Sequence, residues 1–160
     1  MRTKELRIIV YEYDTLYDLP EKDQQLILKA REISKDAYAP YSGFKVGAVL
    51  ELENGEILQA NNQENADFTD GLCAERVALF YAGANFPSEA VKTLVVTARN
   101  PGGLIEDPAR PCGSCRQVLL ETEYRQKSTI RIILDGKKCI QILENADCLL
   151  PLGFKPDSLD

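Results

Sequence analysis

The sequence contains no histidine and no tryptophan, and it has only one methionine among its 160 residues. Without histidine, no metal site or catalytic site in this chain can use an imidazole. Cationic side chains are also in the minority, because 19 lysine and arginine residues stand against 25 aspartate and glutamate residues and leave a net charge of −6. Nucleic-acid binding needs clustered lysine and arginine to neutralise phosphates. We therefore expect no nucleic-acid partner and a small, neutral ligand instead.

Long hydrophobic runs are missing as well. The N-terminal stretch MRTKELRIIVYEYD has a short apolar run at residues 8–10, followed by acidic residues. That run is too short for a signal-peptide core or a membrane span, so we expect no membrane partner and a cytoplasmic location. Five cysteines in a chain without an export signal are expected to stay reduced. Such cysteines are more often metal-binding or catalytic than disulfide-bonded.

The spacing of apolar residues predicts helices that alternate with strands. The expected helices cover residues 21–37, 73–84 and 112–123, and Gly83 is a possible C-terminal cap of the second. A hairpin of two antiparallel strands is expected around the Asn54-Gly55 turn, with Phe44 at the start of its first strand. Further strands are expected at residues 92–99, 129–136 and 137–143. This alternation predicts an α/β layered domain, and the length suits a single domain.

The stretch RPCGSCRQ, residues 110–117, places Cys112 and Cys115 three positions apart. Such a pair can act in disulfide exchange, form half of a structural zinc site, or supply two ligands of a catalytic metal. A closed zinc site needs four protein ligands, and the chain has no second pair of this kind. Cys139 and Cys148 lie within apolar runs, where a free cysteine behaves as a small core residue.

Cys73 differs from those two cysteines because it opens an expected helix, as Cys112 does. Helix N-termini stabilise negative charge, so two of them can present thiolates to one metal ion. Three protein ligands leave the fourth tetrahedral position to water, which is typical of catalytic zinc. Glu75 falls in the first turn after Cys73, where it could serve as general base and acid or only favour the helix dipole. Arg76 and Arg116 directly follow the motifs, and we expect them to donate hydrogen bonds to the sulfurs.

CAER at residues 73–76 and PCGSCRQV at 111–118 resemble the zinc-dependent cytidine deaminases of the small type with three cysteine ligands. Three more segments resemble that family in the expected order: YAPYSGFKVGAVL at 38–50, NQENA at 62–66 and LLPLGF at 149–154. Several motifs in agreement over residues 26–154 are more specific than a lone cysteine pair. Residues 1–25 form an N-terminal arm outside the common pattern, and residues 155–160 form a C-terminal tail.

The resemblance implies a three-layer α/β/α sandwich around a mixed sheet, one Zn²⁺ per chain on Cys73, Cys112 and Cys115, and a homotetramer. It implies hydrolytic deamination of cytidine and 2′-deoxycytidine in pyrimidine salvage, with Glu75 as the group that moves protons. The substrate-binding residues that it implies are Phe44, Asn62, Glu64, Ala66 and Phe154. Asn62 and Glu64 would reach a ribose hydroxyl, and Phe44 would lie against the ring. The backbone of Ala66 would help to hold the sugar, often that of a neighbouring subunit. Phe154 would reach the pocket of a neighbouring subunit.

The sequence departs from the family at two places near the expected pocket. Asp67, Phe68 and Thr69 replace a common Ser-Tyr-Pro, and Arg110 stands where serine is usual. These positions bear on substrate preference and leave the metal ligands and Glu75 untouched. Two alternative functions stay open at this point. One is a sister deaminase of the same fold that acts on another cytosine compound such as blasticidin S, and the other is a non-catalytic zinc or thiol module.

Overall fold

A single mixed sheet forms the centre of the computed structural model, which describes residues 1–159. The strands follow the order β1-β7-β6-β4-β2-β3, and the short β5 pairs with β4. β4 and β6 are parallel, and every other pair of neighbouring strands is antiparallel. The strands are β1 (Tyr11–Tyr13), β2 (Lys45–Leu52), β3 (Ile57–Asn61), β4 (Val91–Asn100), β5 (Gly103–Leu104), β6 (Arg131–Asp135) and β7 (Ile140–Leu143). The mixed sheet that the resemblance implied is thereby confirmed.

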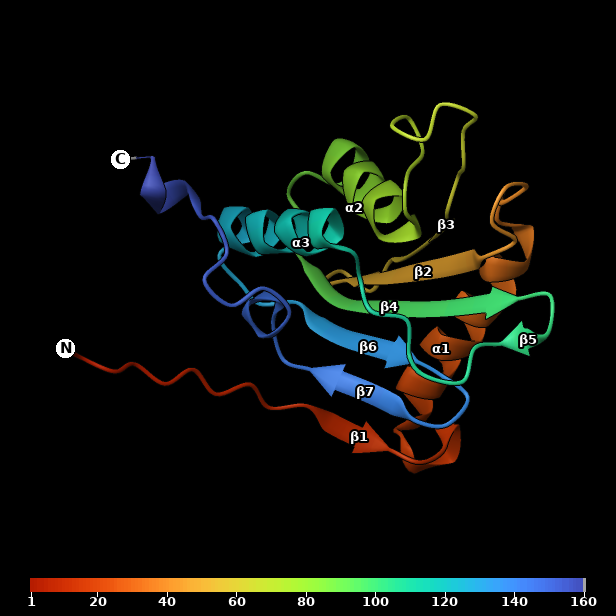
Figure 1. The fold of residues 1–160 in the computed structure, drawn as a ribbon, viewed down its shortest axis with the longest axis horizontal. Helices are drawn as coiled ribbons and strands as arrows, with labels where there is room; N and C mark the ends of the chain where they lie inside the picture. Colours follow the sequence, from red (N-terminus) through yellow and green to blue (C-terminus); the bar gives the residue numbers. More distant parts are fainter. Residues whose placement is uncertain (160) are drawn as a thin grey trace.

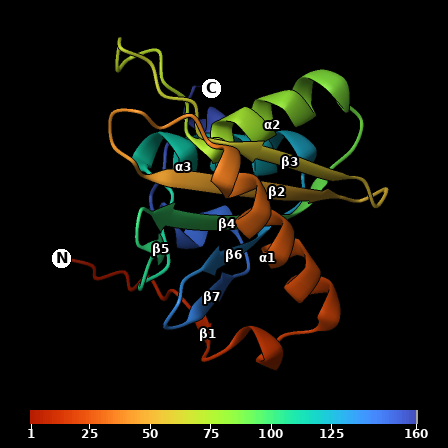
Figure 2. The same cartoon turned by 90° about the vertical axis from the view of Figure 1, so that its right-hand side faces the viewer.

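Three α-helices cover the two faces of this sheet: α1 (Glu21–Ile33), α2 (Ala74–Asn85) and α3 (Gly113–Gln126). α1 lies on one face, and α2 and α3 lie together on the other (Figures 1 and 2). Side chains of β4 alternate between the two cores, because Leu94 and Val96 pack with α2 and α3 whereas Val95 packs with α1. Two apolar cores on opposite faces of one sheet make the expected three-layer α/β/α sandwich, which is confirmed.

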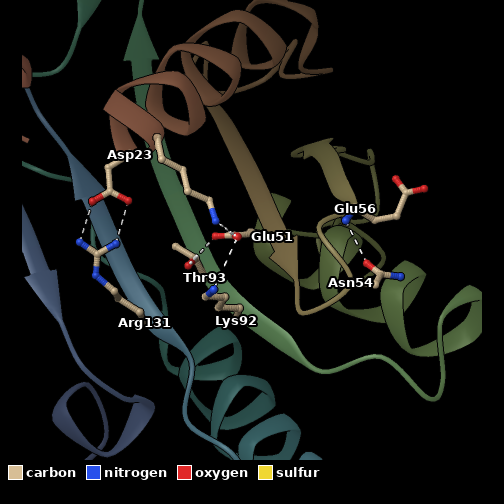
Figure 3. Close-up of polar contacts among 8 residues, drawn as sticks. Asp23, Glu51, Asn54, Glu56, Lys92, Thr93 and Arg131 are labelled. Atoms are coloured by element: carbon tan, nitrogen blue, oxygen red, sulfur yellow. Dashed lines mark hydrogen bonds and ion pairs between the residues drawn. The ribbon is translucent and has the colours of Figure 1, made fainter. Parts of the chain in front are cut away.

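Buried carboxylates fasten α1 to its face of the sheet (Figure 3). Both oxygens of Asp23 on α1 accept hydrogen bonds from the Arg131 guanidinium on β6, at 2.8 Å each. Glu51 on β2 is 4% exposed, and its carboxylate accepts hydrogen bonds from Lys22 on α1 and from Thr93 on β4. A buried charge is tolerated only when it is paired in this way. These contacts lie on the face of the sheet opposite α2 and α3.

The elements expected from sequence are present with shifted ends, and two strands were missed. Gly83 is not a helix cap, because α2 continues to Asn85 and ends at Phe86. A Cβ atom at Gly83 would lie 3.1 Å from the Arg125 guanidinium of α3, so this glycine admits a side chain of the neighbouring helix. The missed strands are β1 and β5, of three and two residues. Such short segments carry no usable periodicity.

None of the helices within residues 1–159 combines the length and the apolar character that crossing a bilayer requires.

Candidate active site

Three cysteine sulfurs meet where the N-termini of α2 and α3 approach each other. Cys73 is the N-terminal cap residue of α2, and Cys112 is that of α3. Cys115 lies three positions after Cys112, within the first turn of α3. Its side chain is buried, whereas Cys112 is exposed. Because both helices pack on the same face of the sheet, sequence positions 39 residues apart are brought into contact.

The distances among these sulfurs fit a tetrahedral zinc site. Cys73 Sγ lies 3.8 Å from Cys112 Sγ, and Cys112 Sγ lies 3.5 Å from Cys115 Sγ. All three sulfurs lie within 4.8 Å of one another. Zn–S bonds of about 2.3 Å at tetrahedral angles hold sulfurs about 3.8 Å apart. Cys139 and Cys148 lie outside the cluster, so no fourth cysteine closes it within residues 1–159. The donor set therefore fits zinc with one open position.

The electrostatics of the cluster favour a thiolate at Cys73. The pKa of the Cys73 thiol is lowered to about 5, because the neighbouring Cys115 thiol donates to this sulfur and Arg76 donates to it as well. The pKa of the Cys115 thiol is raised by the same contact with Cys73 and by burial. The Arg76 guanidinium lies 3.8 Å from Cys73 Sγ, as expected from the sequence. Its Nε atom is buried and has no hydrogen-bond partner within residues 1–159.

Arg116 does not contact the sulfurs, and that expectation is corrected. Its Nε donates to the Pro111 carbonyl at 2.7 Å, and its Nη1 donates to the Leu149 carbonyl at 2.8 Å. The side chain therefore ties the start of α3 to the segment that follows β7. The physical reason is that two backbone carbonyls, one of them brought close only by the fold, accept hydrogen bonds from the guanidinium.

Glu75 lies in the first turn of α2 and is 4% exposed. Its side chain lines a pocket of about 660 Å³, together with Cys73 and Cys112. Burial raises the pKa of the Glu75 carboxyl, because removing a carboxylate from water disfavours its charged form. Pockets for small molecules usually measure about 300–1,000 Å³, so this one can admit a nucleoside-sized ligand beside the carboxyl. A buried carboxyl here can hold a proton and release it near the metal site.

Asn62 and Glu64 line the same pocket, and both side chains also form hydrogen bonds with the backbone of other pocket-lining residues. The Asn62 side chain bridges the chain entering β2, because its Oδ1 accepts from the Val46 N–H at 2.7 Å and its Nδ2 donates to the Phe44 carbonyl at 3.0 Å. The Glu64 carboxylate accepts from the Tyr41 N–H at 2.9 Å. Hydrogen bonds from Ser42 and Tyr41 lower the pKa of Glu64. The resemblance implied that both residues reach a ribose hydroxyl; both line this pocket, and the contact with a sugar stays a prediction.

Other expected substrate residues divide into two groups. Phe44 lines the pocket from the residue directly before β2. Ala66 and Phe154 do not line it: Ala66 is exposed on the loop after β3, and the Phe154 side chain is 57% exposed beside α3. The backbone carbonyl of Phe154 accepts a hydrogen bond from Gln117 at 2.8 Å.

The rim of the pocket contains side chains whose role the sequence did not reveal. Tyr41 and Phe68 form an edge-to-face pair with ring centroids 5.9 Å apart, and both rings are exposed. Arg110 also lines the pocket, and it donates a 3.3 Å hydrogen bond to Gln141 on β7. Phe68 and Arg110 are two of the departures from the family pattern. Nothing in the sequence indicated that Tyr41 lines a pocket, apart from its place in the YSGF stretch at residues 41–44.

A cysteine-lined zinc site at two helix N-termini, beside a buried carboxylate and on one face of a mixed sheet, defines a zinc-dependent hydrolytic enzyme. The model of the cytidine and deoxycytidylate deaminase zinc-binding region matches residues 20–130, and the chain belongs to that family.

Individual relatives agree with this assignment. The chain is 40% identical over 98 residues to the cytidine deaminase of Halalkalibacterium halodurans, which covers 61% of this chain and 70% of the relative. It is 32% identical over 132 residues to the cytidine deaminase of Mycoplasma genitalium, covering 81% and 93%. The crystal structure of cytidine deaminase from Burkholderia pseudomallei superimposes with a TM-score of 0.70 at 35% identity, covering 85% of this chain and 100% of the other.

Proposed function

We propose that this protein catalyses the hydrolytic deamination of cytidine and 2′-deoxycytidine, in which water and the nucleoside yield the uridine product and ammonia. The observation that carries the proposal is the placement of the buried Glu75 carboxyl in one pocket with Cys73 and Cys112, two members of the three-cysteine cluster. The family match and the named relatives support the same reaction. This activity belongs to pyrimidine salvage.

We assign the ligands of one Zn²⁺ to Cys73, Cys112 and Cys115. Bound zinc supplies a Lewis acid that makes water nucleophilic at neutral pH. Arg76 offsets the charge of three thiolates by donating to Cys73. Glu75 accepts one proton from the attacking water and passes it to N3 of the cytosine ring. It then takes the second proton of that water, from the hydroxyl now on C4, and passes it to the departing amine as the C4–N bond breaks and the C4 carbonyl forms. Burial favours the protonated form of Glu75, which suits a group that must return the proton it takes.

Substrate binding is assigned to the walls of the same pocket. Asn62 uses one N–H of its amide for the Phe44 carbonyl, so its second N–H is left for a ribose hydroxyl. Glu64 keeps lone pairs beyond those that accept from the turn at Tyr41, and it can accept from a second hydroxyl. The ring of Phe44 lies at the pocket wall, where it can pack against the pyrimidine.

We propose that the active protein is a homotetramer whose neighbouring subunits complete each pocket. The exposed positions of Ala66 and Phe154, outside the pocket of their own chain, support this assembly. Phe154→Ala should then weaken substrate binding more than it lowers folding stability. A monomeric form should be nearly inactive, and sedimentation measured beside activity tests this. A fully active monomer would refute the shared pocket.

Two further assignments accompany this function. We divide the chain into an N-terminal arm of residues 1–25, a catalytic region of residues 26–154 and a tail of residues 155–160. We also propose a cytoplasmic location, because three unoxidised cysteine ligands are best preserved in a reducing compartment, and all five cysteines are free.

The direct test combines a substrate panel with metal analysis of cysteine variants. We expect conversion of cytidine and 2′-deoxycytidine and little conversion of a cytosine-containing oligonucleotide. Cys73→Ala, Cys112→Ala and Cys115→Ala should lose zinc, whereas the matched controls Cys139→Ala and Cys148→Ala should keep one zinc per chain. Full zinc occupancy in the first three variants would overturn the ligand assignment. Turnover of blasticidin S without turnover of cytidine would replace the proposed substrate by the alternative one.

A further inference from the structure

Residues 1–10, the first part of the N-terminal arm, continue beyond the sheet as an extended segment. β1 pairs with β7 only from Tyr11 to Tyr13. Residues 1–9 precede that strand and make no hydrogen bond within residues 1–159. Figure 1 shows this segment running away from the body of the molecule, past the end of β7. β1 is also the last strand at its side of the sheet, so the outer edge of the arm is open.

Residues 6–10 expose aliphatic side chains, although a segment that stays in water is usually polar. Four aliphatic side chains lie 44–51% exposed along these residues, namely Leu6, Ile8, Ile9 and Val10. Ile8, Val10 and Glu12 line one groove with Leu143 and Leu149, so the even-numbered residues share the face on which α2 and α3 lie. An open strand edge with exposed aliphatic side chains is a surface for pairing with another strand.

The charge of the arm differs in sign from that of the rest of the chain. Residues 1–10 contain three cationic side chains and one acidic side chain, whereas the whole chain has a net charge of −6. Arg2, Lys4 and Arg7 form no salt bridge within residues 1–159. A partner for this segment should therefore offer a carboxylate beside an apolar strand. The arm itself contains both, because Glu12 follows the aliphatic run.

The arm is complementary to a second copy of itself in one antiparallel register. A twofold axis perpendicular to the sheet at Ile8 places Ile8 opposite its own copy, Leu6 opposite Val10, and Lys4 opposite Glu12. Each of the last two pairs occurs twice by symmetry. Moving the axis to Arg7 opposes two like charges, and moving it to Ile9 opposes Leu6 to the Glu12 carboxylate. Cross-strand pairs of matched character stabilise a sheet, and mismatched ones destabilise it.

We propose that two copies of this protein associate through antiparallel pairing of their N-terminal arms, centred on Ile8, so that the two sheets join at β1. The occupant of the open edge is thus the arm of a second copy. This inference rests on the arm alone and is independent of the proposed catalytic function. The contact uses the open edge of β1, and the groove lined by Ile8, Val10 and Glu12 shares Arg110 with the pocket that contains Glu75.

Two full-length variants that differ by one position test the pairing. Ile8→Glu places two carboxylates opposite each other at the axis, so self-association should weaken by about tenfold or more. Ile9→Glu is the matched control, because residue 9 lies on the other face opposite Arg7 and has a similar exposure in the single chain. Sedimentation over a range of concentrations should show that Ile8→Glu halves the mass of the parent assembly, while Ile9→Glu preserves it. Equal masses for the parent and Ile8→Glu would overturn the proposal.

A cross-linking experiment tests the register separately. Ile8→Cys should form a disulfide between two copies on mild oxidation, because directly opposite Cβ atoms lie about 4.5–5.5 Å apart in an antiparallel pair. Ile9→Cys should form far less, and the unsubstituted protein controls for the five native cysteines. Circular dichroism confirms that each variant is folded. Stronger cross-linking through position 9 than through position 8 would refute the pairing centred on Ile8.

Discussion

Replacing Glu75 by glutamine separates the proton-transfer role of this residue from its structural role. The side chain is 4% exposed and lies in the first turn of α2, so a substitution of the same shape leaves the surrounding packing in place. Glutamine cannot accept and return a proton at neutral pH. We expect Glu75→Gln to keep zinc and bind cytidine, and to lose turnover.

The size of the loss follows from the surroundings of Glu75. A positioned general acid–base contributes about 10²–10⁴-fold to a rate, which is roughly 3–5.5 kcal/mol at 1.36 kcal/mol per tenfold. The chain has no histidine that could take over the proton transfers. Because one carboxyl serves more than one proton transfer in the proposed mechanism, we expect the loss at or above the upper end of this range.

The assay follows the absorbance change from cytidine to uridine under saturating substrate. Zinc content, measured on the same preparation, and calorimetric binding of cytidine show whether the metal and the pocket survive. Glu64→Gln is the matched control, because it makes the same chemical change in the same pocket at a residue assigned to the sugar. That control should raise KM more than it lowers kcat. Turnover of Glu75→Gln within tenfold of the parent would show that another group carries the protons.

Three further predictions concern the folding stability of variants at buried and half-buried positions around the sheet and its helices. Gly47→Ala should be strongly destabilising in urea unfolding, since its Cβ would lie 2.2 Å from the Ala30 carbonyl of α1, and an unchanged midpoint would contradict this close approach. Asp135→Asn should lower the free energy of unfolding by about 3–5 kcal/mol, because the fully buried Asp135 accepts two 2.8 Å hydrogen bonds from Arg31. A loss below about 1 kcal/mol would refute the importance of this ion pair. Burial raises the pKa of the Glu123 carboxyl in the folded state. Ionising this carboxyl above a pH of about 4.3 therefore lowers the free energy of unfolding of the parent protein. Glutamine does not ionise, so the gain in free energy of unfolding from Glu123→Gln should grow as the pH rises above that value. If the stability gain of Glu123→Gln over the parent shrinks as the pH rises, the predicted direction of the pKa shift is wrong.

Some features of this protein depend on residues that are close together in the chain, and the sequence predicts them directly. Helical spacing locates α1, α2 and α3, and the positions of Cys73 and Cys112 at helix starts follow from where those helices begin. The three-residue spacing of Cys112 and Cys115 places both sulfurs near one helix N-terminus. Glu75 falls in a first turn for the same reason. Local backbone geometry determines each of these, so the metal ligands and the proton-transfer residue could be proposed before the structure.

Other features arise only when distant segments pack together. Arg116 donates to the Leu149 carbonyl, 33 positions away, and local spacing could not show that this acceptor replaces the sulfurs. Asn62 holds the start of β2 through Val46, which depends on the register between β2 and β3. β1 exists because residues 11–13 meet β7 from the far end of the chain. Contacts of this kind are set by the closure of the sheet and the burial of its faces, so only the tertiary structure could decide them.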